Sequence, residues 1–251
     1  MSAPALSARG LQKSFGSLVV ARDIELALPV GARYALIGPN GAGKTTLINL
    51  MTGILAPNAG QILLGDEDIT ALMPQERVQR GIARTFQINT LFPGLNALEA
   101  VTLAVAERRG LTRRFWQNVA DNKEAIDEAH DILVKLQLDD CCYQPTRELP
   151  YGRQRLLEIA LALATRPKAL LLDEPAAGVP QDESADIFEA VAGLSRDLAL
   201  LFVEHDMHVV FRFASHIIVM VAGAIYTEGS PAEIAAHPGV RDVYLGTRKH
   251  G

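Results

Sequence analysis

The sequence predicts an α/β fold in which a mostly parallel sheet is interrupted by one inserted helical segment. Three mainly apolar runs predict strands: a compact one at 33–38, and continuous ones at 168–174 and 198–205 that are typical of parallel strands covered on both faces. Apolar residues at helical spacing follow each run, which indicates strands connected through helices. Between about 88 and 165 no strand pattern occurs, and apolar residues recur at helical spacing there.

The spacing of apolar residues changes after the first of these strands, and this change marks where a helix follows it. The run RYALIG at 33–38 is compact, and from Lys44 the apolar positions fall on one helical face. The segment 60–70 has the pattern of a strand followed by a turn and a short helix. The remaining expected elements are helices at 96–109, 121–138, 183–195 and 206–213, a hairpin through Gly223, and short helices near 231–236 and 239–245.

The composition is that of a globular protein without a nucleic-acid partner. The chain has 251 residues, 49% hydrophobic and 21% charged, and its formal net charge is −5. No window reaches the ~20 apolar residues that span a bilayer, and the N-terminus lacks the pattern of a signal peptide. We therefore expect a soluble, cytoplasmic protein.

Two further features have ordinary structural interpretations. The adjacent Cys141 and Cys142 have no metal-ligand spacing around them, and neighbouring cysteines rarely form a bridge. They fit a reducing compartment and packing roles. The basic run at 107–117, which contains Trp116, is interpreted as a solvated helix–loop surface.

The segment GPNGAGKTT at 38–46 follows a predicted strand and opens a predicted helix, the context that a phosphate-binding P-loop requires. Glycines let backbone N–H groups wrap around phosphate oxygens, and the helix start adds partial positive charge. Lys44 would reach the β- and γ-phosphates, Thr45 would ligate Mg²⁺, and Thr46 could reach the α-phosphate. A glycine-rich turn without a ligand is the alternative. The predicted phosphate-binding residues are Gly38, Pro39, Asn40, Gly41, Ala42, Gly43, Lys44, Thr45 and Thr46.

A pair of acidic residues ends the apolar strand at 168–174. Asp173 is placed to hold Mg²⁺ through its water shell, and Glu174 can act as the base toward an attacking water. Acidic pairs at strand ends are common in α/β folds. Downstream of a P-loop, however, this pair predicts a P-loop NTPase that uses Mg²⁺, without indicating which kind of NTPase it is.

Three further residues could complete the nucleotide site. Phe15 lies ahead of the P-loop, where its ring could stack on a nucleobase. Gln87 ends a strand before the helical segment, and His205 ends the strand after Glu174. Both are expected on the γ-phosphate side, with Gln87 also a Mg²⁺ ligand. Taken singly, a core phenylalanine, a turn glutamine and a helix-capping histidine are the alternatives.

With these motifs in this order, the sequence resembles the ATP-binding cassette (ABC) transporter ATPases from Phe15 to Gly246. More narrowly, it resembles the ATPase subunits of branched-chain (hydrophobic) amino acid importers. The closer resemblance rests on RTFQINTLFPGLNALEAV, YGRQRLLEIALAL, DEPAAG, VEHDM and GSPAEIAAHPGVRDVYLG. It implies one ABC domain over 1–251: a RecA-like core with an antiparallel β subdomain at 1–87 and 166–251, and a helical subdomain at 88–165.

The segment LPYGRQR at 149–155 occupies the place of the family signature, usually LSGGQQR, which caps the γ-phosphate of ATP bound to the opposite subunit. Pro150 removes a hydroxyl and a backbone N–H, and a hydrogen bond to a charged group contributes about 1.5–3 kcal/mol. Arg153 could add positive charge near the phosphate. We expect this segment to function in binding the γ-phosphate, but more weakly than the usual signature does. The pattern is kept at Leu149, Gly152, Gln154 and Arg155, the first three being assigned to ATP binding, and is replaced at Pro150, Tyr151 and Arg153.

The loop after Glu174 also departs from the family. Where the family has Ser-Ala-Leu-Asp or Ala-Gly-Leu-Asn, Val179 is followed directly by Pro180, so the Asp or Asn is missing. This puts in doubt how tightly the two sites of a dimer are coupled, though not hydrolysis itself.

The resemblance implies a head-to-tail dimer around two ATP molecules, formed with a second copy or with a paralogous ATPase. Glu174 would activate water, Lys44 and Mg²⁺ would offset charge, and His205 and Gln87 would position the γ-phosphate. Transport would require integral-membrane permease subunits and, indirectly, a periplasmic solute-binding protein, with the ATPase on the cytoplasmic face of the inner membrane. Branched-chain amino acids are the first expectation for the cargo; urea, short amides and aromatic acids also fit.

Three other functions are weighed against this one. The form of LPYGRQR argues against an ATPase for lipid or lipopolysaccharide extraction. The single cassette and the acidic charge argue against a soluble ABC protein of DNA repair or translation. Intact Lys44, Asp173, Glu174 and His205 argue against a non-catalytic binding subunit.

Overall fold

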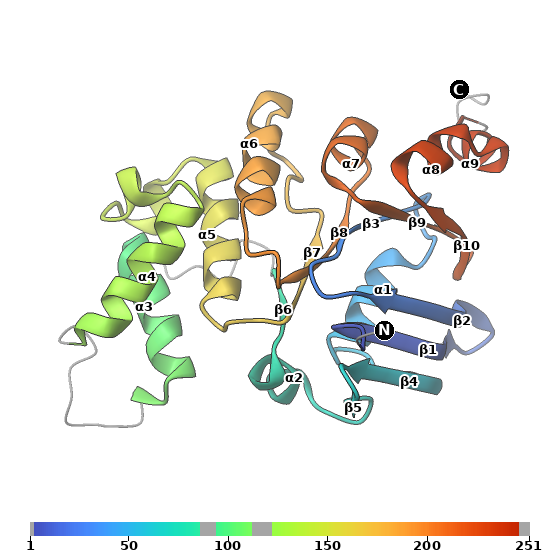
Figure 1. Cartoon of the computed structure of the whole chain (residues 1–251), viewed down its shortest axis with the longest axis horizontal. Coiled ribbons are helices and arrows are strands. Elements are labelled where there is room, and N and C mark those ends of the chain that lie inside the picture. The colour runs from blue at the N-terminus through green and yellow to red at the C-terminus, as the bar shows by residue number, and fades with distance from the viewer. Residues whose placement is uncertain (1–2, 86–93, 112–121, 246–251) are drawn as a thin grey trace. The chain divides into compact units, whose positions relative to one another are not determined.

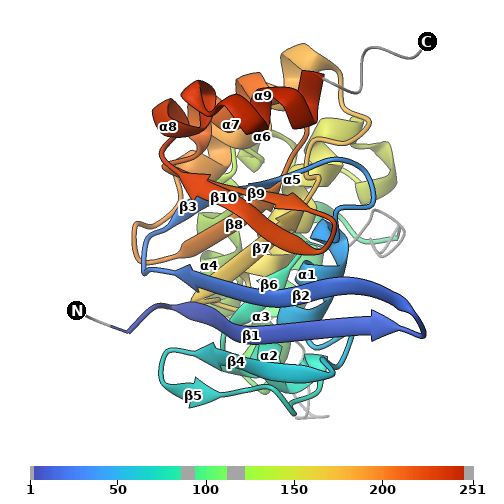
Figure 2. The same ribbon diagram turned by 90° about the vertical axis from the view of Figure 1, so that its right-hand side faces the viewer.

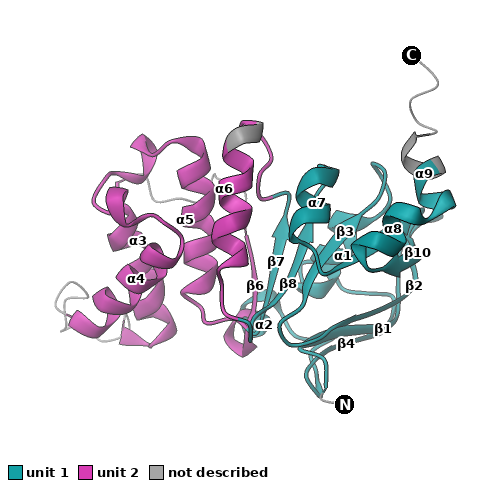
Figure 3. Ribbon diagram, turned by 45° about the horizontal axis from the view of Figure 1, so that its top comes forward, with its two compact units in different colours: residues 1–77, 168–174, 196–251 teal, residues 78–167, 175–195 magenta. Residues whose placement is uncertain are grey.

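The structure is a computed structural model of the whole chain, and it describes residues 3–85, 94–111 and 122–245 (Figure 1). Two compact units make up the chain (Figure 3). Unit 1 holds residues 1–77, 168–174 and 196–251, and unit 2 holds residues 78–167 and 175–195. The subdomain boundaries that the family resemblance implies remain a prediction.

Unit 1 contains an antiparallel sheet in the order β2-β1-β4-β5, and Figure 2 shows β1 and β2 as its long hairpin. The apolar alternation of β1 is interrupted by an irregularity between Ala8 and Leu11, where Gly10 has φ +56°. This break explains why the sequence did not define the hairpin. The sheet confirms the antiparallel β subdomain. Its strands are β1 (Leu6–Phe15), β2 (Leu18–Leu28), β4 (Ala59–Leu64) and β5 (Glu67–Asp68).

The expectation that segment 60–70 ends in a short helix after the turn is wrong, because a second strand, β5, follows the turn there. The chain turns at Gly65, which has φ +60°, and β5 then pairs back onto β4. A glycine at positive φ favours such a tight reversal over the start of a helix. The next helix, α2, begins only at Pro74 and ends at Arg80.

Of the four parallel strands of unit 1, the apolar runs predicted β3, β7 and β8, whereas β9 was expected only as an arm of the hairpin through Gly223. In the larger sheet its strands follow the order β10-β9-β3-β8-β7, with β3, β7, β8 and β9 parallel and β10 antiparallel to β9. The β9–β10 hairpin turns through Ala222 and Gly223, as predicted. The bounds are β3 (Arg33–Ile37), β7 (Ala169–Asp173), β8 (Ala199–Val203), β9 (His216–Val221) and β10 (Ala224–Gly229).

The helices of unit 1 confirm the expected positions. α1 begins at Lys44 and contacts both β2 and β7. α8 begins with a capping box, in which the Ser230 side chain and Glu233 satisfy each other's backbone N–H groups. The bounds are α1 (Lys44–Met51), α7 (Met207–Phe213), α8 (Pro231–Ala236) and α9 (Pro238–Leu245).

Unit 2 confirms the helical insertion. Helices α3, α4 and α5 contact one another, and α5 also contacts α6 and the short strand β6. Cys141 and Cys142 are buried and free, as expected. The bounds are β6 (Ile82–Arg84), α3 (Ala97–Arg108), α4 (Lys123–Lys135), α5 (Tyr151–Leu163) and α6 (Gln181–Ala192), with 3₁₀ turns at Asp139–Cys141 and Thr146–Glu148.

The described part of the basic run at 107–117 is not simply a solvated surface. Arg108 and Arg109 form ion pairs with Glu128 of α4 at 2.6 and 2.7 Å, and Arg166 pairs with the same carboxylate at 2.8 Å. These partners hold the pKa of Glu128 below its ordinary value, although its burial acts to raise it. The run therefore joins α3 to α4. Residues 112–117 lie outside the described residues.

Candidate nucleotide-binding site

The P-loop lies between β3 and α1, as the sequence predicted. Gly43 is the N-cap of α1 with φ +102°, and a Cβ atom there would lie 2.6 Å from the Val20 carbonyl oxygen. At Gly38 a Cβ atom would lie 2.2 Å from the Met220 carbonyl oxygen. Both positions thus require glycine, because neighbouring backbone leaves no room for a side chain.

Lys44, the first residue of α1, bends back over this loop. Its Nζ donates hydrogen bonds to the carbonyl oxygens of Gly38 at 2.7 Å and Pro39 at 3.1 Å. Burial lowers the pKa of Lys44, while the negative charges of Glu174 and Asp173 act to raise it. The structure therefore brings these three predicted residues into electrostatic contact.

The sheet explains why the lysine and the acidic pair come together. β8 lies between β3 and β7, and the three strands are parallel, with Val203 in register with both Leu36 and Asp173. Their carboxyl ends therefore meet at one edge. Glu174 follows β7 with φ +50°, and its backbone N–H donates to the Val203 carbonyl oxygen at 3.1 Å. That bond fixes the backbone of Glu174 in an uncommon conformation for a non-glycine residue.

His205 follows β8 at the same edge and is 74% exposed. The helix-capping alternative for this residue is wrong, because the Asp206 side chain caps α7 by accepting from the His208 N–H at 2.8 Å. Sequence reasoning missed the neighbouring Glu204, which is only 4% exposed and accepts the His205 backbone N–H at 3.2 Å. Its position at the end of a predicted strand, in FVEHDM, was visible in the sequence, but a single acidic residue at a strand end does not by itself indicate a functional or a buried residue.

The other predicted residues of this site are placed as follows. Phe15 ends β1 and is 51% exposed, with the Lys13 Nζ 5.2 Å from its ring centroid, so the core alternative is wrong. Thr45 is exposed and Thr46 half-buried in the first turn of α1. Gln87 lies outside the described residues.

The signature segment belongs to unit 2 and begins α5. Pro150 is the N-cap, so its missing N–H costs no intrahelical bond. The Gln154 side chain donates to the Leu149 carbonyl oxygen at 2.8 Å, which ties the helix to the preceding turn. Gly152 is buried, and a Cβ atom there would lie 3.0 Å from Glu183 Oε2.

The two arginines of this segment are held within unit 2. Arg153 donates to both carboxylate oxygens of Asp140, at 3.0 and 3.1 Å, and to the Gln137 carbonyl oxygen. Arg153 can therefore add positive charge near a phosphate, as expected, only when its ion pair with Asp140 opens. Arg155 donates to Glu158 Oε2 at 3.1 Å, and no pattern in the sequence indicates that this glutamate is buried.

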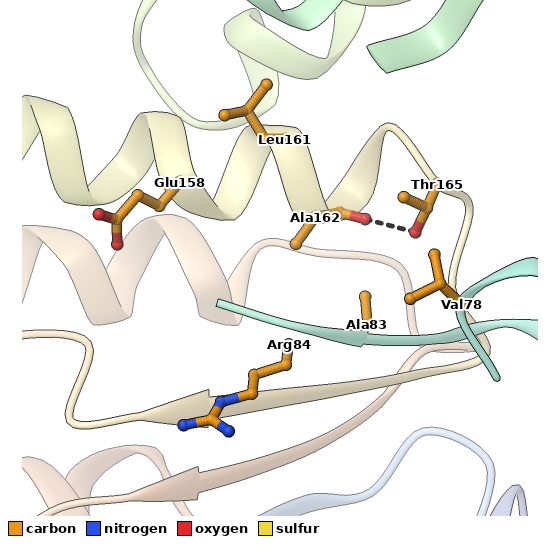
Figure 4. Close-up of a pocket in the computed structure, with 7 residues that line it drawn as sticks. All are labelled: Val78, Ala83, Arg84, Glu158, Leu161, Ala162 and Thr165. Atoms are coloured by element: carbon orange, nitrogen blue, oxygen red, sulfur yellow. Dashed lines mark hydrogen bonds between the residues drawn. The ribbon is translucent and has the colours of Figure 1, made fainter. Parts of the chain in front are cut away.

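A cavity of about 170 Å³ lies elsewhere in unit 2, beside α5 and β6 (Figure 4). Figure 4 shows Ala83 on the side of β6 that faces α5, while Arg84 points to the other side. Thr165 Oγ1 donates to the Ala162 carbonyl oxygen at 2.7 Å. The wall toward α5 is thus mainly apolar, as packing of a helix on a strand produces. The lining residues are Val78, Ala83, Arg84, Glu158, Leu161, Ala162 and Thr165.

The site combines a strand, a glycine-rich turn and a lysine that opens a helix with the acidic end of a second strand, and one strand lies between the two. This combination defines a P-loop nucleotide-binding protein. The chain belongs to the ABC transporter family, whose model matches residues 21–177. A second model, described as "Branched-chain amino acid ATP-binding cassette transporter", matches residues 227–250. Members of the ABC transporter ATP-binding family hydrolyse ATP to power transport.

Curated relatives extend over nearly the whole chain. The chain is 36% identical to the "High-affinity branched-chain amino acid transport ATP-binding protein BraF" of Pseudomonas aeruginosa, covering 98% of this chain and 99% of that one. It is also 36% identical, with the same coverage, to the LivG protein of Escherichia coli K12, whose name carries the same description. A probable LivG of Archaeoglobus fulgidus is 32% identical over 97% of this chain and 96% of its own.

Solved structures support the same fold. One similar chain is a nucleotide-free ATP-binding cassette from an ABC transporter, with a TM-score of 0.83, 30% identity, and coverage of 97% of this chain and 99% of that one. Another is an ATP-binding cassette in its ADP conformation, with a TM-score of 0.84, 31% identity, and coverage of 98% and 99%. In the described residues no helix is both long and apolar enough to cross a membrane.

Proposed function

We propose that this protein is the Mg²⁺-dependent ATPase subunit of an importer for branched-chain amino acids and works with separate membrane permease subunits. The observation that carries the proposal is the position of Lys44 at the start of α1, within electrostatic reach of Asp173 and Glu174. This is the set of charges that phosphoryl transfer to water requires.

In this proposal the P-loop holds the triphosphate. The N–H groups at the start of α1 and the Lys44 ammonium group bind phosphate oxygens, so that Lys44 exchanges the Gly38 and Pro39 carbonyls for phosphate. The hydroxyl of Thr45 and the carboxylate of Asp173 are oxygen ligands of the kind that Mg²⁺ prefers. When bound, Mg²⁺ supplies neutralisation of the charge on the β- and γ-phosphates.

Glu174 acts as the general base. Its backbone is fixed by the hydrogen bond to Val203, which presents the side chain at the carboxyl edge of the sheet. There it would take a proton from the water that attacks the γ-phosphorus. Exposed His205, at the end of the neighbouring strand, would contact the γ-phosphate. Gln87 would contribute to the same side as a ligand of the metal, and Phe15 would stack on the base.

The partners follow from the family and the signature segment. Two ATPase subunits, either two copies of this chain or this chain and a paralogue, would place residues 149–155 of one subunit over the nucleotide of the other. Leu149, Gly152 and Gln154 would approach that phosphate. The assembly would dock on permease subunits at the cytoplasmic face of the inner membrane, and a periplasmic solute-binding protein would supply the cargo. Branched-chain amino acids are proposed because BraF and LivG are named for their transport.

The proposal is tested by replacing LivG in E. coli cells that lack it and measuring leucine uptake, with binding and hydrolysis of Mg-ATP measured on the purified protein. We expect uptake with the wild-type chain and none with Lys44→Ala. Hydrolysis in vitro without leucine uptake would contradict the cargo assignment, and failure to bind Mg-ATP would contradict the ATPase assignment itself.

A further inference from the structure

Tyr151 packs directly on the loop that follows Glu174. Gly178 of this loop has φ +79°, and a Cβ atom on it would lie 3.3 Å from Tyr151 Oη and 3.4 Å from Cε1. The tyrosine ring therefore covers the α-carbon of Gly178 closely. The loop itself is a tight turn, because the Val179 N–H donates to the Ala176 carbonyl oxygen at 3.1 Å.

Arg155, one helical turn after Tyr151, holds the ring in this position. Its Nη2 donates to Tyr151 Oη at 3.1 Å, and its guanidinium carbon lies 5.3 Å from the ring centroid. The same Nη2 is 3.4 Å from the Ala177 carbonyl oxygen, at the long end of the hydrogen-bond range. Arg155 thus touches both the tyrosine and the loop.

Glu158 completes this row on one face of α5. It accepts from Arg155 Nη1 at 3.1 Å, and Arg155 and Glu158 are only 8% and 5% exposed. A charge-assisted bond in such a shielded position fixes the guanidinium plane, and with it the direction of the two Nη2 contacts. Glu158, Arg155 and Tyr151 therefore form a connected row of contacts along one face of α5, which ends at Tyr151, the first residue of the helix.

We propose that Tyr151 and Arg155 are positioning residues that clamp the loop at 175–180 against the start of α5. The inference rests on the proposed function, in which Glu174, directly before this loop, is the general base. The loop lacks the Asp or Asn expected after Val179, and the contacts of Tyr151 and Arg155 add to the Val179–Ala176 hydrogen bond in holding its conformation. The clamp connects the loop at 175–180, which directly follows the proposed general base Glu174, to the signature segment at 149–155 of the same subunit.

The clamp predicts different effects on binding and turnover. It touches no residue of the P-loop, so loosening it lowers kcat for ATP hydrolysis and leaves the affinity of the isolated subunit for ATP unchanged. It also exposes the Val179 amide, whose hydrogen bond closes the turn. Hydrogen exchange at residues 176–179 reports this directly, without any need for ATPase activity.

The test compares Tyr151→Ala, Tyr151→Phe and Gly178→Ala with Tyr143→Ala, a control at a 75% exposed tyrosine of the same unit. Tyr151→Ala is expected to accelerate exchange at 176–179 and to lower kcat, each by about tenfold, which corresponds to about 1.4 kcal/mol. Tyr151→Phe keeps the ring and loses only the Arg155 bond, so its effect is smaller. Gly178→Ala disturbs the same contact from the loop side and also strains the backbone at φ +79°, so its effect is expected to be at least as large as that of Tyr151→Ala.

Two results would overturn the inference. Unchanged exchange at 176–179 in both Tyr151→Ala and Gly178→Ala shows that the ring does not hold the loop. Faster exchange with kcat unchanged shows that the loop conformation does not matter for turnover. If the wild-type protein hydrolyses no ATP at all, the proposed function fails instead, and the exchange result still decides whether the clamp exists.

Discussion

Arg155 Nη1 lies 3.1 Å from Glu158 Oε2, yet this ion pair does not overcome the burial of the carboxylate. Burial raises the pKa of Glu158 from its ordinary value of 4.5 to about 6, against the lowering effect of Arg155. One reason is that Oε1 is buried and has no hydrogen-bond partner among the described residues. The charged form is therefore stabilised on one oxygen only.

This pKa predicts a pH dependence of stability. Because the folded state holds the proton of Glu158 more tightly than the unfolded chain, the contribution of this group to the free energy of unfolding falls as pH rises from about 4.5 to about 6. The loss amounts to about 2 kcal/mol. Glu158→Gln removes the titration, so the difference in unfolding free energy between wild type and variant should change by that amount across the window. A difference independent of pH contradicts the prediction; denaturant unfolding at several pH values measures it.

Gly43→Ala is expected to weaken Mg-ATP binding at least about tenfold, because its Cβ atom would meet the Val20 carbonyl and displace the start of α1. Gly41→Ala is the matched control. Gly41 also has positive φ, +79°, but no neighbouring heavy atom lies within 4 Å of a Cβ atom there. Titration calorimetry with Mg-ATP compares the two. Equal losses would show that backbone strain, rather than the contact with Val20, sets the requirement for glycine.

Arg77 is the most important buried polar residue that the sequence did not reveal. It is 1% exposed, and its guanidinium donates to the carbonyl oxygens at the end of α1 and of the following turns. These acceptors are the carbonyl oxygens of Leu50, Met51, Thr70 and Leu72, at 2.8, 2.9, 2.8 and 3.1 Å.

Arg77→Met is expected to lower the free energy of unfolding by at least about 3 kcal/mol, since it keeps the apolar stem but removes the guanidinium from four carbonyl groups, of which the Leu50 carbonyl keeps the Gly53 N–H as a second donor. Arg147→Met is the control, because Arg147 is 68% exposed and its ion pair with the adjacent Glu148 is long, at 3.7 Å. Chemical denaturation of both variants makes the comparison. A loss no larger than that of the control would mean that the carbonyls find other donors.

Ala83→Val is expected to stabilise the protein by about 1 kcal/mol. Ala83 is 3% exposed on β6 and lines the cavity of about 170 Å³, so two added carbons enter space that already exists. Valine also suits a strand position. Destabilisation in urea or thermal unfolding would show that the wall toward α5 cannot accept them.

Much of the fold could be predicted because its strands and helices have strong local patterns. The strands ending at Asp173 and Val203 are uninterrupted apolar runs, and the glycines around Lys44 are dictated by the turn they make. The parallel order then places their ends together. The hairpin of β1 and β2 was not defined, since an irregularity near Gly10 breaks its alternation.

The side-chain contacts could not be predicted, because they depend on distances between residues that local patterns do not specify. Nothing in the sequence around Arg77 indicates that its acceptors lie at the end of another helix. The signature segment departs from the family pattern at Tyr151, but only the structure places its ring on Gly178. Burial of Glu158 likewise follows from packing within unit 2.

The most direct test of the central claim is Mg-ATP turnover of Glu174→Gln beside the wild type, with light scattering of both in the presence of Mg-ATP. The Glu148→Gln variant, at an exposed glutamate, is the control. A general base contributes about 10²–10⁴-fold, so we predict turnover at least about 100-fold lower with nucleotide affinity retained, and an ATP-dependent dimer. Turnover of Glu174→Gln equal to that of the wild type would contradict the account.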